Sequence, residues 1–340
     1  MLDVNAHLHT PYSFSAFKDI DEALDLAAAE SVKVVGINDF YSTDGYPEWK
    51  EGCARRGLFP LFGIEFISLN EEDQAAGLRV NDPNNPGRTY ISGKGLACPP
   101  RLSGEPLRQL EAVRKASNEQ VRSMCAKLNE WLKAEGYDIS LDFNEIREKF
   151  TLGSIRERHL AKALRVALYP DAADPAKIEN DLRSKLLKAG GPAFVPERSE
   201  AFLPMATVQK IIEAAGGIPT YPFLGDDAKG NFTDFEGNLQ KAADTLRKRG
   251  FHSVEFITTR NTTAVLEQYA GYLEDEGFIV TFGSEHNTPA MEPIRLRTRD
   301  NGSLSDKLKA INWRGACAVA AHQAGLDSPA AGEELIMKSL

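Results

Sequence analysis

Short apolar runs alternate with amphipathic stretches in the first third of the chain. Strands are predicted where apolar residues cluster, at 1–4, 32–37 and 61–65. A helix is predicted between the first two strands, over 20–31, with Asp19 as a suitable N-cap. This order of strand, helix and strand is typical of a parallel sheet or a β/α barrel.

The alternation stops near residue 70. Residues 79–100 are dense in asparagine, proline and glycine, which favour turns. Two long helical stretches follow, 105–135 and 142–187. We therefore expect residues 71–203 to form a mainly helical insertion.

After the insertion, strands and helices alternate again. Together with a short strand around 89–91, the total is about seven parallel strands. The sequence thus predicts an α/β fold, a barrel made of residues 1–70 and 204–300, followed by C-terminal helices and a tail over 301–340. The later helices are predicted over 205–215, 238–249 and 262–276, and the later strands over 217–222, 252–257 and 278–282.

The composition restricts the classes of function. A formal net charge of −9 argues against general nucleic-acid binding. The sequence contains no apolar run of the ~18 residues that a membrane span needs, so we expect no membrane association. The four cysteines are scattered without a CxxC spacing, which predicts reduced thiols in a cytoplasmic protein. Nothing in the sequence indicates an oligomeric state.

Two histidines, His7 and His9, lie one residue apart where the first predicted strand ends. In a strand, residues i and i+2 point to the same face, so the two imidazoles lie side by side. Neutral imidazole is a good ligand for divalent transition metals. This spacing therefore predicts the start of a metal site, and the alternative is two chance histidines near a chain end.

Further polar side chains fall at the carboxyl ends of the predicted strands. In β/α barrels the loops at these ends build the active site. Imidazoles and carboxylates that converge there predict a divalent-metal site. The residues at these positions are Asp39, Glu65, Tyr221, Glu285 and His286.

The order of these motifs resembles that of the PHP (polymerase and histidinol phosphatase) superfamily of metal-dependent phosphoesterases. The resemblance implies a distorted seven-stranded (β/α)7 barrel, with the insertion covering the active site. The matching segments are His7-Leu8-His9-Thr10, Gly36-Ile37-Asn38-Asp39-Phe40, Phe62-Gly63-Ile64-Glu65, Gly216-Gly217-Ile218-Pro219-Thr220-Tyr221-Pro222 and Gly283-Ser284-Glu285-His286-Asn287.

The resemblance also implies which residues bind metal. One ion would be held by two imidazoles and two carboxylates, from His7, His9, Glu65 and Glu285. At the positions that bind the family's other ions, this chain has different side chains, namely Phe14, Phe40, Asn287 and Tyr221. We therefore expect one or two divalent ions, which would be zinc, manganese or iron.

Asp39 and His286 are candidates for an additional ligand or for a group that acts with a metal-bound water. The alternatives are a strand-end cap for Asp39 and a solvated loop histidine for His286. Asp39 is also a candidate for an acceptor that fixes the tautomer of a ligating histidine.

Basic residues of the predicted insertion are candidates for binding a substrate phosphate or carboxylate. A solvated basic helix face is the alternative for the group around 156–165. The candidates are Arg88, Lys94, Arg158, His159 and Lys162 in the insertion and Arg260 after a later strand.

The function that we predict is metal-dependent hydrolysis of a small phosphorylated molecule by a metal-activated water. Phe14 and Phe40 leave a second hypothesis open, an inactive barrel that binds a ligand in an apolar pocket. A third hypothesis keeps the metal-dependent hydrolase but has an amide or lactone as its substrate.

Overall fold

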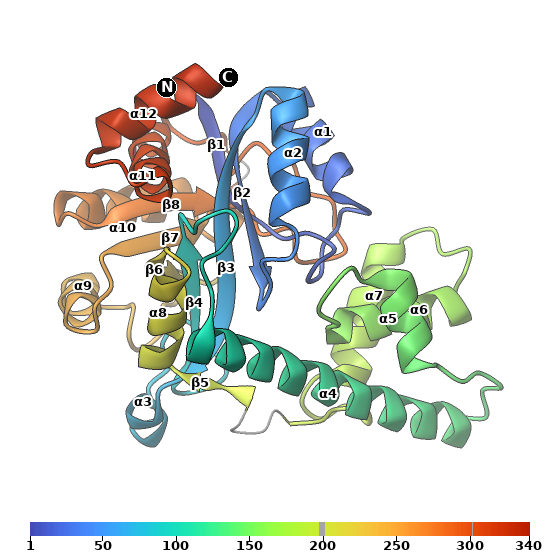
Figure 1. The fold of residues 1–340 in the computed structure, drawn as a ribbon. Coiled ribbons are helices and arrows are strands. Elements are labelled where there is room, and N and C mark those ends of the chain that lie inside the picture. The colour runs from blue at the N-terminus through green and yellow to red at the C-terminus, as the bar shows by residue number, and fades with distance from the viewer. Residues whose placement is uncertain (197–200, 301) are drawn as a thin grey trace.

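The computed structural model describes residues 1–196, 201–300 and 302–340. Strands form one continuous sheet in the order β1-β2-β3-β4-β6-β7-β8, and a parallel bridge between Leu8 and Glu285 joins its two ends (Figure 1). The predicted distorted seven-stranded barrel is confirmed, and the sheet is nearly closed. The strands are β1 (Asp3–Leu8), β2 (Val32–Phe40), β3 (Phe59–Leu69), β4 (Arg88–Lys94), β6 (Ile218–Phe223), β7 (Ser253–Ile257) and β8 (Ile279–Gly283), and β5 (Leu203–Pro204) pairs with β3.

The prediction of seven parallel strands is wrong for β4, which pairs antiparallel with both β3 and β6. The reason lies in the connection between β3 and β4. Asn70 N donates to Gly87 O at 2.8 Å, so the segment between them begins and ends at the same point. The chain therefore turns back on itself as in a hairpin, whereas a parallel pair needs a crossover to the opposite end of the strand.

Helices α1, α2, α8, α10 and α11 pack against the barrel strands. Helix α1 begins as predicted, with the Asp19 carboxylate accepting a hydrogen bond from Glu22 N at 2.7 Å. The predicted C-terminal tail contains a further helix, α12, which packs on α11. Outside the insertion the helices are α1 (Ile20–Ala29), α2 (Tyr46–Arg56), α3 (Glu71–Ala75), α8 (Met205–Ala214), α9 (Leu239–Lys248), α10 (Thr263–Asp275), α11 (Asp306–Ala324), α12 (Pro329–Ser339) and a 3-10 turn at Thr258–Arg260.

The segment after β4 is helical, and its helices α5, α6 and α7 gather beside the barrel along the long helix α4 (Figure 1). It has its own apolar core, in which Leu128 and Leu132 pack with Leu160 and Leu164. Within the predicted insertion of residues 71–203, β4 is a strand of the barrel sheet, and this helical group begins at α4. The elements are α4 (Gly104–Ala134), α5 (Phe143–Phe150), α6 (Glu157–Leu168), α7 (Pro175–Leu182) and a π-helical turn at Arg183–Leu187. Among the helices of the described ranges, none has the length and apolar composition of a membrane span.

Backbone contacts fix the insertion to the loop that follows β1. Leu152 N donates to Pro11 O at 3.0 Å, and Ser154 N donates to Tyr12 O at 2.9 Å. Gly153 lies between them, and an added Cβ there would be 2.5 Å from Tyr12 O. This close approach needs glycine, so the insertion is docked at a defined position beside the carboxyl end of β1.

The packing of α11 on β8 makes a prediction about stability. At Gly315 an added Cβ would overlap the carbonyl oxygen of Val280 in β8. Overpacking of this kind costs about 1–3 kcal/mol, so Gly315→Ala should lower the free energy of unfolding, measured by urea denaturation. Gly271→Ala in α10 is the control, because its Cβ would meet only the flexible end of Lys307. Equal stability of Gly315→Ala and the wild type would contradict this account.

Candidate metal centre

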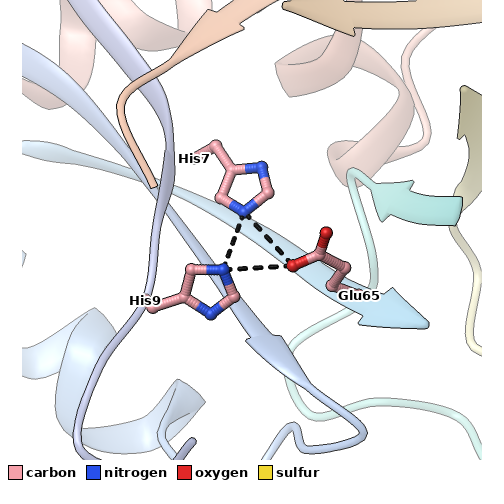
Figure 2. Close-up of side chains that lie close together, drawn as sticks. All are labelled: His7, His9 and Glu65. Carbon is pink, nitrogen blue, oxygen red and sulfur yellow. Dashed lines mark hydrogen bonds and ion pairs between the residues drawn. The ribbon is translucent and has the colours of Figure 1, made fainter. Parts of the chain in front are cut away.

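Three candidate metal ligands, two from the end of β1 and one from β3, converge on one point (Figure 2). His7 lies in β1 and His9 just beyond it, and both imidazoles project from the same face. Their Nε2 atoms are 3.2 Å apart, and Glu65 Oε2 lies 3.1 Å from His9 Nε2 and 3.7 Å from His7 Nε2. All three residues are buried. Within the described ranges, this is the one group of histidine, cysteine or carboxylate side chains whose ligand atoms converge in this way.

The spacing of the three atoms fits a divalent ion. Ligands about 2.1 Å from a tetrahedral ion lie about 3.4 Å from one another, and the separations here run from 3.1 to 3.7 Å. Glu65 Oε2 is buried and has no hydrogen-bond partner among the described residues. Burial raises the pKa of Glu65, and the carboxylates of Glu285 and Glu255 raise it further. A cation between the three atoms would offset both effects and satisfy the unpaired oxygen.

Hydrogen bonds on the other ring nitrogens direct both Nε2 atoms into the cluster. His7 Nδ1 lies 3.0 Å from Glu255 Oε2, and His9 Nδ1 lies 3.2 Å from Ser13 Oγ. Ser13 donates to Asp39 Oδ1 at 2.6 Å, so its oxygen is left to accept from His9. Burial lowers the pKa of His9, despite nearby carboxylates that raise it. A neutral imidazole that donates from Nδ1 presents the Nε2 lone pair, as a metal ligand must.

Glu285, the fourth predicted ligand, lies at the same end of the barrel but outside the converging group. Its Oε2 pairs with Arg260 at 2.8 Å. Burial opposes ionisation, but Arg260 and the two histidines hold the pKa of Glu285 below its ordinary value. The role of Glu285 as a metal ligand stays a prediction.

Asp39 and His286, the candidates for an additional ligand, also lie outside the converging group. Asp39 accepts hydrogen bonds from Thr10 N at 2.7 Å and from Ser13, and it orients His9 through that hydroxyl. His286 is buried, with Nδ1 2.8 Å from Ser284 Oγ and Nε2 2.7 Å from the backbone oxygen of Glu292. Both ring nitrogens of His286 therefore face hydrogen-bond partners rather than the cluster, and it is not the solvated histidine of the alternative.

At positions where the resemblance implies missing ligands, the structure has aromatic contacts. Phe40 stacks on His9, with ring centroids 5.1 Å apart, and the Arg156 guanidinium lies 4.6 Å from the Phe40 ring centre. Phe14 packs edge-on against His159 at 5.0 Å. The Tyr221 hydroxyl donates to Glu236 Oε1 at 2.8 Å.

A cavity of about 1370 Å³ opens between the barrel rim and the insertion. It reaches the cluster at Glu65 and is lined by aromatic rings that include Phe14, Phe40 and Tyr90. Cationic side chains from both sides also line it, namely Arg88, Arg156, Arg158, Arg183, Lys188 and Arg260. Carboxylates line it as well, and several of them pair with these cations, as Glu157 does with Arg183 and Glu285 with Arg260. The space next to the cluster is therefore large and has charged walls.

Of the predicted substrate-binding residues, Arg88, Arg158 and Arg260 line the cavity, and the other three do not. Lys94 is buried beneath His7 and pairs with Glu255 at 2.7 Å. The His159 ring is buried, and its Nδ1 accepts a hydrogen bond from Arg156 N at 2.9 Å. Lys162 lies over the ring of Phe150, 5.4 Å from its centre. These three residues thus contact other groups of the protein, and their role in substrate binding stays a prediction.

Sequence reasoning misses Glu255, which contacts His7 from β7. A carboxylate in the middle of an otherwise apolar strand is the one indication of a buried partner. It also misses Asn38 and Ser92, which hydrogen-bond to each other and to this group. Nothing in the sequence shows that these residues face one another.

No protein-family model and no curated protein matches this chain. Its fold is similar to that of a protein from Bifidobacterium adolescentis described as a candidate metal-dependent phosphoesterase, with a TM-score of 0.64 and 17% identity over 91% of this chain and 94% of the other. An amidohydrolase from Chromobacterium violaceum, solved with bound sulfate and no metal, has a TM-score of 0.63 and 20% identity over 91% of this chain and 96% of the other. The chain has the fold of these two proteins. At these identities the likeness concerns the fold alone.

The converging ligands predict the metal content of the purified protein. Protein prepared without chelators should contain about one tightly bound divalent ion per chain, measured by elemental analysis. The double substitution His7→Ala/His9→Ala removes two of the three converging donors and should abolish binding. Wild-type protein without metal after incubation with zinc, manganese and iron would contradict the metal site.

Acid should destabilise the protein through His159. Burial, Lys162 and Arg156 lower the pKa of His159 to about 3, whereas an unfolded chain has a histidine pKa of about 6.5. Between these values protons bind the unfolded chain preferentially, so the free energy of unfolding falls as the pH falls through this range.

The variant His159→Gln has no titratable group at this position and should lose less stability than the wild type between about pH 7 and about pH 4.5. Urea denaturation at the two pH values measures the difference. An identical pH dependence of the two proteins would show that His159 does not stay neutral in the folded state.

Proposed function

We propose that the protein is a metal-dependent hydrolase that cleaves a phosphoester bond in a small anionic molecule. The proposal depends on one observation, the convergence of His7, His9 and Glu65 beside a cavity whose walls carry arginines. A divalent ion held by these residues would supply a bound water of lowered pKa and would polarise a phosphoryl oxygen. The imidazoles and the carboxylate are the donor types that zinc, manganese and iron accept.

The charges around the cluster suit an anionic substrate. Glu255 pairs with Lys94 at 2.7 Å, and Glu285 pairs with Arg260 at 2.8 Å. Among the described residues, Glu65 has two imidazoles but no lysine or arginine within ion-pairing distance. Its single negative charge offsets half the charge of a divalent ion. The remaining positive charge would face the cavity, where it attracts a phosphate.

Arg158 supports the binding of an anion in the cavity. Its guanidinium lies 5.6 Å from the Phe14 ring centre, and Nη1 donates to Asn180 at 3.1 Å. No carboxylate of the described residues is within ion-pairing distance of it. Burial lowers the pKa of Arg158 to about 10, so the side chain is still charged at neutral pH. A partly buried guanidinium without a carboxylate partner is well suited to a bidentate contact with phosphate.

Hydrolysis of an aryl phosphate tests the proposal. With added manganese or zinc, the wild type should release p-nitrophenol from p-nitrophenyl phosphate. His9→Ala should lose at least roughly a hundredfold in kcat/KM, because it removes a ligand of the ion. His252→Ala is the control, because this exposed histidine precedes β7 and lies outside the cluster. Equal loss in both variants would remove the support for the metal site as the catalytic centre.

A second pair of variants tests the role of the cavity in binding. Arg158→Gln should raise KM about tenfold, since a charged hydrogen bond contributes roughly 1.5–3 kcal/mol. Arg122→Gln is the matched control from the same insertion, because Arg122 is exposed and packs on Phe143 away from the cavity. Turnover of an amide or a lactone but of no phosphoester would favour the third hypothesis, a metal-dependent amide or lactone hydrolase. Bound metal without turnover of any of the three would favour a ligand-binding protein.

A further inference from the structure

A wholly buried polar network lies on the inner side of the metal cluster. Glu255 Oε2 is 2.7 Å from Lys94 Nζ and 3.0 Å from His7 Nδ1. Its other oxygen, Oε1, accepts a hydrogen bond from Ser92 Oγ. The exposed fraction is 0% for Glu255 and 2% for Lys94. An ion pair at this depth needs an explanation, because taking two charges out of water costs several kcal/mol per ion.

Lys94 is fully matched to its surroundings. An ammonium group has three donors, and three acceptors surround Nζ, namely the Glu255 carboxylate at 2.7 Å, Ala6 O at 3.1 Å and Asn38 Oδ1 at 3.2 Å. Lys94 thus fixes two groups that contact His7. It holds Glu255 in place, and it matches the orientation of the Asn38 amide in which the oxygen faces Nζ and the nitrogen faces the His7 ring, 3.1 Å from Nε2 and 3.3 Å from Nδ1.

We propose that Glu255 and Lys94 are positioning residues of the metal site, which hold His7 in the tautomer that carries its hydrogen on Nδ1 and offers the Nε2 lone pair to the metal. The inference rests on the proposed function only in that the ion it serves is the one bound by His7, His9 and Glu65.

The contact with Glu255 determines this tautomer. The carboxylate of Glu255 already accepts from the donors Lys94 and Ser92 and can only accept from His7, so the bond between them is made when His7 Nδ1 donates. The Asn38 amide nitrogen lies 3.1 Å from Nε2 and 3.3 Å from Nδ1, so it does not distinguish the two ring nitrogens. The hydrogen is therefore placed on Nδ1 by Glu255. A ligand whose second nitrogen is held by a carboxylate is also more basic and better oriented.

His9 shows what the network adds at His7. Its Nδ1 reaches Asp39 only through the Ser13 hydroxyl, and the direct separation from Asp39 Oδ1 is 3.9 Å. Among the described residues, Asp39 has no lysine or arginine within ion-pairing distance, whereas Glu255 has Lys94. The two ligating imidazoles are therefore oriented by different means, and His7 depends on a buried charge pair.

The first measurement uses the metal-free wild-type protein and needs neither metal nor activity. Nitrogen-15 NMR of labelled histidine distinguishes the two neutral tautomers, and His7→Gln identifies the signal of His7. We expect one tautomer at neutral pH, with the hydrogen on Nδ1. A hydrogen on Nε2, or a mixture of the two forms, would overturn the inference even if the protein binds metal. Conversely, if the protein binds no metal, the proposed function is wrong, but the tautomer measured by NMR still decides whether Glu255 orients His7.

The second measurement compares manganese or zinc affinity by calorimetry. Glu255→Gln should weaken binding about 10- to 100-fold, as loss of such a partner does in other metal sites, and should give a mixture of His7 tautomers. The control is Glu236→Gln, which alters an equally buried carboxylate that bonds Tyr221 and the backbone amides of Leu224 and Gly225 rather than a histidine. Its affinity should stay within about twofold of the wild type, whatever its stability.

Equal metal affinity of Glu255→Gln and Glu236→Gln, with the His7 tautomer unchanged, would show that Glu255 serves the fold alone. If Glu255→Gln does not fold, Lys94→Met/Glu255→Gln removes both buried charges together and leaves neither unpaired. This double variant should also bind metal 10- to 100-fold more weakly. Wild-type affinity in the double variant would overturn the inference.

Discussion

The junction between the first strand and the end of the last strand fixes the position of the site. His9 N donates to Glu285 O at 2.7 Å, and Glu285 N donates to His7 O at 3.0 Å. Gly283 precedes this junction, and a side chain there would overlap Cβ of His7. Glu285 and His286 both adopt left-handed conformations, with φ of 64° and 57°. The hydrogen bonds that close the barrel are thus the same ones that hold the two imidazoles beside Glu65.

Closure of the barrel also buries the candidate metal ligands and the carboxylates around them away from water. Burial of a charged side chain costs free energy, and neighbouring side chains offset this cost. A buried carboxylate is stable only with a partner. Lys94 supplies it for Glu255, and Arg260 supplies it for Glu285. At Glu65 one oxygen remains without a hydrogen bond among the described residues, and two imidazoles point towards it. The fold therefore compensates the charges around the cluster and leaves the cluster itself suited to a cation.

The sequence predicts the parts of this structure that depend on local pattern. Apolar runs locate β1, β2 and β3, and a spacing of two residues places His7 and His9 on one face. The direction of β4 is not a local property, because it follows from the bond between Asn70 and Gly87 that brings the ends of β3 and β4 together.

The inner side of the site is equally inaccessible to sequence reasoning. Lys94 and Glu255 are 161 positions apart in the chain and meet only when β4 and β7 take their places in the closed sheet. A lysine in a glycine-rich segment favours an exposed cation, and burial by tertiary pairing overrides that preference. The residues that orient a ligand are therefore harder to predict than the ligand, because their roles depend on contacts across the barrel rather than on a motif.

Phe14 and Phe40 lie between the candidate metal cluster and the insertion, and each contacts side chains of the insertion. Phe40 contacts His9 on one side and the Arg156 guanidinium, 4.6 Å from its ring centre, on the other. Phe14 contacts His159 and lies 5.6 Å from the Arg158 guanidinium. Neither ring can bind a metal, but each can attract a guanidinium through its π-face. The same side chains that offer no ligand to a second ion thus place two cations of the insertion at the cavity, next to the cluster of His7, His9 and Glu65.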